Sequence, residues 1–215
     1  MKILLNIKDA KDIEKFPHIR DLIVLCHIIN TNHSARNQYL RISQRAQTPS
    51  SMRDNIYGML QLSSLTYEAM HKASSIFKKL MENIPKDLYS EIAWVHTEIK
   101  SSNSFYNKVL KPIRNELGFH FSHCLANLPL QKSIPHVPPI FAESDEENNS
   151  ELIYILPTDI MSSYFLSLVS EPVDPVERIN WLITKLGEYN NRIMNLFRTV
   201  VYSIIEELEP SLLVK

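Results

Sequence analysis

Apolar residues recur at three- and four-residue spacing along most of the chain, which is the pattern of amphipathic helices. The first such run, Leu22 to Ile29, follows Pro17, and a proline is tolerated in a first helical turn. Later runs end at breaks such as Thr48-Pro49-Ser50-Ser51 and Asn83-Ile84-Pro85. The pattern predicts helices over about 17–46, 51–81, 86–100, 104–123, 158–170 and 175–208.

Two regions depart from this pattern. Pro112 falls inside the fourth predicted helix and is expected either to kink it or to restart it. Residues 128–157 form a proline-rich and acidic insertion, predicted as a loop with a short strand at 151–156. That strand needs a partner, and the segments 2–7 and 137–142 are the two candidates. A minor β-pairing is therefore the most β-structure that we expect.

Glycine is scarce, with only Gly58, Gly118 and Gly187 in 215 residues. The chain therefore lacks G-x-G-x-x-G, P-loop and kinase glycine motifs, and it has few residues suited to the tight turns of hairpin-rich sandwiches. A chain of this length is typical of one domain with its own core. We predict an all-α fold, an antiparallel bundle of about six helices that forms a single domain over 1–215.

The charges divide unevenly between the two parts of the chain. Residues 1–130 hold 17 Lys and Arg against 11 Asp and Glu, whereas residues 131–215 hold six against 13. The basic part can attract polyanions, or it can pair with the acidic part inside the fold. Cys26 and Cys124 belong to no disulfide or zinc pattern, and no segment is typical of a membrane span or signal peptide. These features predict a cytoplasmic protein without membrane contact.

Polar residues form a stripe on the distal half of the first predicted helix. His33, Asn37, Arg41 and Arg45 recur every four residues, so they lie along one face. One interpretation is a solvated face. The other is an RNA-contacting surface made by arginines with Tyr39 as a stacking residue. The arginines of this second interpretation are Arg36, Arg41, Arg45 and Arg53.

The fourth predicted helix carries the most suggestive motif. Arg114 is followed by Asn115, four further residues and His120, with apolar residues around them. This spacing resembles the R-x(4–6)-H motif of the HEPN superfamily, helical domains that include metal-independent RNases of toxin–antitoxin and defence systems. The resemblance implies His120 as general acid/base, Arg114 as phosphate clamp and Asn115 as a polar orienting residue. It also implies RNA as substrate, a homodimer, an antitoxin or regulatory protein as a further partner, and no cofactor.

Arginine and histidine suit this chemistry because RNA cleavage needs a proton-transferring group near neutral pH and a cation beside the phosphate. On a regular helix, however, residues six positions apart lie about 120° apart around the axis. In HEPN proteins two protomers bring their motif helices together, so that one cleft holds both pairs. The alternative is a non-catalytic helical module that binds RNA, a nucleotide or a protein, with Arg114 in a salt bridge to an acidic neighbour.

Metal chemistry has weaker support in the sequence. His120 and His123 could ligate a metal with Glu116, and Glu68 and His71 form one E-x-x-H motif. A carboxylate-bridged di-iron bundle uses two such motifs and two further glutamates. The sequence contains only one E-x-x-H. We therefore predict no metal site.

Overall fold

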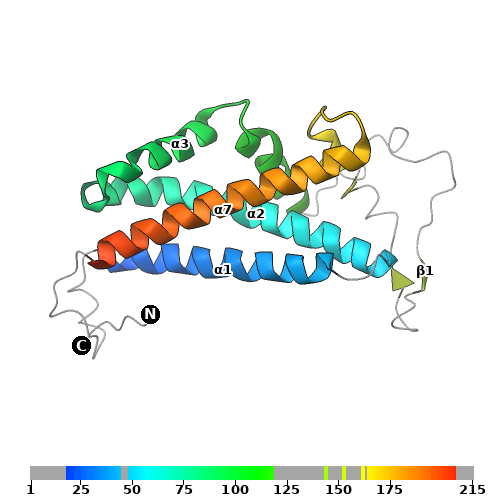
Figure 1. Ribbon diagram of the computed structural model, residues 1–215, viewed down its shortest axis with the longest axis horizontal. Coiled ribbons are helices and arrows are strands. Elements are labelled where there is room, and N and C mark those ends of the chain that lie inside the picture. Colours follow the sequence, from blue (N-terminus) through cyan, green and yellow to red (C-terminus); the bar gives the residue numbers. More distant parts are fainter. Residues whose placement is uncertain are drawn as a thin grey trace.

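The computed structural model describes residues 18–44, 48–118, 143–144, 152–153, 161–162 and 164–206. Long helices lie side by side and form an elongated bundle (Figure 1). The predicted all-α fold is confirmed. No helix within these ranges is both long and apolar enough to cross a membrane. The helical elements are α1 (Ile19–Ser43), α2 (Pro49–Leu80), η2 (Met81–Asn83), η3 (Lys86–Leu88), α3 (Tyr89–Lys100), η4 (Tyr106–Leu110), η5 (Ile113–Gly118) and α7 (Pro175–Glu206).

The start of α2 is specified by its first four residues. The Thr48 side chain accepts a hydrogen bond from the backbone N–H of Ser51, and the Ser51 hydroxyl accepts one from the backbone N–H of Thr48. Pro49 occupies the first helical position, where its missing N–H has no intrahelical partner to lose. This reciprocal cap begins the helix two residues before the predicted boundary.

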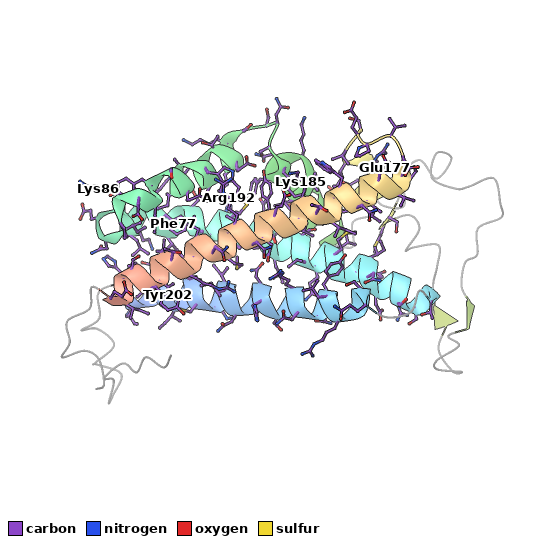
Figure 2. All side chains as sticks on the ribbon, viewed as in Figure 1. Phe77, Lys86, Glu177, Lys185, Arg192 and Tyr202 are labelled. Atoms are coloured by element: carbon purple, nitrogen blue, oxygen red, sulfur yellow. The ribbon has the colours of Figure 1, made fainter. Side chains whose placement is uncertain are left out.

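The successive helices α1 and α2 run antiparallel. Lys79 near the end of α2 pairs with Asp21 near the start of α1, whereas Tyr39 near the end of α1 lies against Gly58 in α2. A Cβ at Gly58 would stand 3.3 Å from Cδ2 of Tyr39, so the small residue permits this close approach. α7 runs antiparallel to α1 and α3 and parallel to α2 (Figure 1). Figure 2 shows Arg192 on the side of α7 that faces α3.

The interior is mainly apolar, and a network of polar side chains lies inside it. Phe77 of α2 and Phe197 of α7 meet edge to face with ring centroids 5.6 Å apart, and both are fully buried. Nearer the start of α7, the buried amide of Asn190 donates to Oδ1 of Asn32 and to Oγ1 of Thr66, each at 3.0 Å. Buried polar groups cost free energy unless they are paired. This network therefore ties α7, α1 and α2 together at one register.

The fourth predicted helix is present but has π geometry. It is helical from Phe105, with π hydrogen bonding over η4 and η5 and two α-helical residues, Lys111 and Pro112, between them. Proline lacks the N–H that would continue an α-helical ladder, and the wider π register accommodates such an interruption. Pro112 thus perturbs the helix without ending it.

A minor β-pairing joins β1 (Glu143–Ser144) to β2 (Leu152–Ile153). The two strands are antiparallel, with Glu143 opposite Ile153. β2 falls inside the strand predicted at 151–156. The predicted partner segments, 2–7 and 137–142, lie outside the described residues; the described partner, β1, directly follows the second of them.

Replacement of Asn190 by Ala tests the central polar network. The change leaves Oδ1 of Asn32 without its donor in a buried position, and we expect a loss of about 1–3 kcal/mol in the free energy of unfolding. Urea denaturation followed by circular dichroism measures it. Asn191→Ala, one residue along on the exposed face of α7, is the matched control and should change stability by less than about 0.5 kcal/mol. Equal effects of the two substitutions would contradict a special role for Asn190.

The environment of His96 in α3 makes the stability of the fold depend on pH. Its Nδ1 lies 3.0 Å from the Ser74 hydroxyl, and burial together with the charges of Lys78 and Lys100 lowers the pKa of His96 below its usual value of 6.5. The unfolded chain then binds the proton more tightly than the folded chain, so stability falls as the pH falls through 6.5 toward the folded pKa. We expect His96→Gln to reduce this loss in urea titrations between about pH 7 and pH 5. An unchanged pH dependence would contradict this contribution.

Candidate functional site

Arg114, the arginine of the motif, lies on η5 where this segment packs against α2. Its Nε is 2.6 Å from Oε1 of Glu68, and the two side chains are 30% and 41% exposed. The ion pair orients a half-exposed guanidinium at the surface. The salt bridge considered in the sequence analysis is therefore confirmed, and Glu68 is its acidic partner.

Aromatic side chains surround this pair on the α2 side. Tyr67 stacks between Tyr106 and His71, with ring centroids 4.7 Å and 6.0 Å away respectively. Burial raises the pKa of Tyr106 far above its usual range, and a hydrogen bond with Tyr67 and the charge of Glu68 add to this rise. These three effects keep the Tyr106 phenol protonated. His71 is exposed one turn from Glu68, so the site presents an imidazole beside the ion pair.

The structure describes one of the other two motif residues. Asn115 is exposed on η5 next to Arg114. His120 lies outside the described residues. The 120° separation expected for a regular helix does not apply to the described part of the motif, because η5 has π hydrogen bonding and a π turn contains more residues than an α turn.

Glu68 is the site residue that sequence analysis did not assign to Arg114. The residues lie 46 positions apart, and the signal that the sequence offers for Glu68 is the E-x-x-H motif, which is half of a di-iron pattern. In the structure Glu68 binds a guanidinium instead. Within the described ranges no group of three or more His, Cys, Asp or Glu residues could hold a metal ion.

The structure describes three of the four arginines predicted to contact RNA. Arg36 is half-buried on α1 and Arg41 is exposed on the same helix, while Arg45 lies outside the described residues. Arg53 forms an ion pair with Asp54 at 3.0 Å. Tyr39 packs against the core, and burial raises its pKa, so it is not the exposed stacking residue of the RNA interpretation.

Part of the polar stripe nevertheless borders an open depression between α1 and the first turns of α2. Its volume is about 710 Å³. His33, Asn37 and Arg41 of the predicted stripe line it, with Asp54 on the α2 side. The stripe is thus more than a flat solvated face, and it forms a second polar surface besides the Arg114 site.

Comparisons of the chain with protein-family models, curated proteins and solved structures gave no match. They neither support nor oppose the motif resemblance. A functional hypothesis for this chain therefore depends on its own residues.

A double-mutant cycle tests the Glu68–Arg114 pair. Because both side chains are partly exposed, we expect a coupling free energy below about 1 kcal/mol from Glu68→Gln, Arg114→Gln and the double variant. Urea denaturation of the four proteins measures it. A coupling of several kcal/mol would contradict an orienting role and indicate that the pair is a structural requirement of the bundle.

Proposed function

We propose that this protein is a HEPN-like, metal-independent endoribonuclease of toxin or phage-defence type that acts as a homodimer. In this proposal Arg114 is the phosphate clamp, His120 the general acid/base and Asn115 a polar orienting residue. The motif resemblance supplies the assignment of these roles.

The observation that carries the proposal is the geometry of Arg114. An arginine that binds a phosphate has to be both oriented and accessible, because its planar group donates hydrogen bonds in fixed directions. Glu68 accepts a hydrogen bond from Nε and so restricts the rotation of the side chain. Arg114 remains 30% exposed, next to exposed Asn115. The π geometry of η5 also supports a functional role, since π segments are frequent at functional sites.

The reaction needs no group beyond the RNA and these side chains. A base removes the proton from a 2′-hydroxyl, whose oxygen attacks the adjacent phosphorus while the bond to the 5′-oxygen breaks. An acid protonates the leaving oxygen, so the products end in a 2′,3′-cyclic phosphate and a 5′-hydroxyl. Histidine can serve both proton transfers near neutral pH, and arginine meets the charge that develops on the phosphate oxygens.

A non-catalytic module that binds RNA, a nucleotide or a protein is the second candidate function. The observation that favours it is the same ion pair, because Glu68 offsets the positive charge of Arg114. A binding surface tolerates such an offset more easily than a site that must stabilise a transition state. The two candidates differ in whether covalent bonds of the RNA break.

An RNA cleavage assay in EDTA separates them. We expect the wild-type protein to fragment total RNA and to leave 2′,3′-cyclic phosphate and 5′-hydroxyl ends. His120→Ala and Arg114→Ala should each lower the initial rate at least about 100-fold, because general acid–base and electrostatic catalysis contribute effects of this size. Fragment ends are identified by enzymatic phosphorylation and dephosphorylation before sequencing.

Matched controls come from residues elsewhere in the bundle, of which His27 is exposed and Arg198 is partly exposed. His27→Ala on α1 and Arg198→Ala on α7 remove the same side-chain types and should retain wild-type rates. Circular dichroism establishes that all variants keep their helical content. Full activity of both His120→Ala and Arg114→Ala would contradict the assignment, and cleavage that stops in EDTA would contradict the metal-independent mechanism.

A further inference from the structure

The depression between α1 and α2 is built almost wholly from hydrogen-bonding side chains. It borders a second hollow of about 360 Å³ that shares Asn30, Ser34 and Gln38 with it. The larger volume alone is within the range of small-ligand sites. The first is lined by Asn30, His33, Ser34, Asn37, Gln38, Arg41, Ile42 and Asp54.

The charged side chains of this depression are either basic or paired with a side chain of opposite charge. Among the described residues that line it, Asp54 is the single carboxylate, and Arg53 already pairs with it at 3.0 Å. Arg41 is exposed and has no ion pair within the described ranges. His33 and Asn37 hydrogen-bond each other at 2.9 Å, so their side chains are held together on the rim. The surface therefore offers amides, hydroxyls and one available guanidinium.

The two hollows lead toward Arg114 along one face of α2. Gln61 and Leu65 line the smaller hollow, and Glu68, which binds Arg114, follows them at i, i+4 and i+7. Residues with this spacing share a helix face. Gln61 and Glu68 lie about 11 Å apart along the axis at 1.5 Å per residue. The smaller hollow therefore lies on the face of α2 that also carries Glu68, the ion-pair partner of Arg114.

We propose that this depression binds single-stranded RNA and guides it along α2 toward Arg114. The inference rests on the proposed function for the direction of the strand, but the binding itself does not require cleavage. Arginine pairs with phosphate oxygens, and Asn and Gln side chains offer the paired donors and acceptors that recognise base edges. Arg41 takes a phosphate, while Asn37 and Gln38 contact the bases.

The test measures binding of a labelled 2′-O-methyl oligonucleotide of about eight nucleotides, a length suited to a short single-stranded site. This probe lacks the 2′-hydroxyl nucleophile, so it cannot be cleaved. Fluorescence anisotropy at several salt concentrations gives the Kd and its salt dependence. We expect Arg41→Gln to weaken binding at least about fivefold and to reduce the slope of log K against log salt by roughly one phosphate contact.

Arg20→Gln is the matched control, since Arg20 is exposed on the same helix but lies at its other end. It should leave the Kd nearly unchanged. Gln38→Ala is a second, uncharged probe of the depression and should weaken binding without changing the salt slope. Failure of the wild-type protein to bind the probe, or equal affinities of the wild type and Arg41→Gln, would overturn the proposal.

Cleavage of an RNA of the same sequence separates this inference from the proposed function. Cleavage by the wild type with an unchanged KM in Arg41→Gln would overturn the binding site and leave the endoribonuclease intact. Binding that depends on Arg41 without any cleavage would contradict the endoribonuclease and support the site.

Discussion

A single buried amide fixes how the three longest helices stand against one another. Asn190 donates from α7 to Asn32 of α1 and to Thr66 of α2, in an interior that is packed mainly with aliphatic and aromatic side chains. Apolar contacts tolerate a shift between helices, because one methyl group replaces another at modest cost. A shift of one residue would leave these polar atoms unpaired in the core, which costs far more. The network therefore selects one register for α1, α2 and α7.

That register determines which part of α2 remains at the surface. Thr66 faces the core, Tyr67 contacts Tyr106 of η4, and Glu68 remains half-exposed beside Arg114 of η5. Three successive residues of one helix thus serve the core, the neighbouring π segment and the solvent-facing site. Because α2 is held on both sides, Glu68 is presented from a rigid element, and this gives Arg114 a defined position.

The sequence was sufficient for the helices and insufficient for the contacts between them. Helical spacing and the break at Thr48-Pro49-Ser50-Ser51 predicted the bounds of α2 to within two residues, because these signals are local. The π geometry of η4 and η5 was not predicted. Proline indicates that the helix is interrupted, but it does not indicate which hydrogen-bond pattern continues the helix past the interruption. The pairing of Glu68 with Arg114 was not predicted, because a pairing across 46 residues depends on how α2 and η5 pack. His120 remains a prediction.

The ion pair that orients Arg114 is compatible with phosphate binding when the magnitudes are compared. A half-exposed pair such as Glu68–Arg114 contributes less than about 1 kcal/mol, since water screens it and two side chains lose freedom. A charge-assisted hydrogen bond to a ligand contributes roughly 1.5–3 kcal/mol. The interaction with a phosphate is thus the stronger of the two, and the glutamate orients Arg114 at small cost to its affinity for anions.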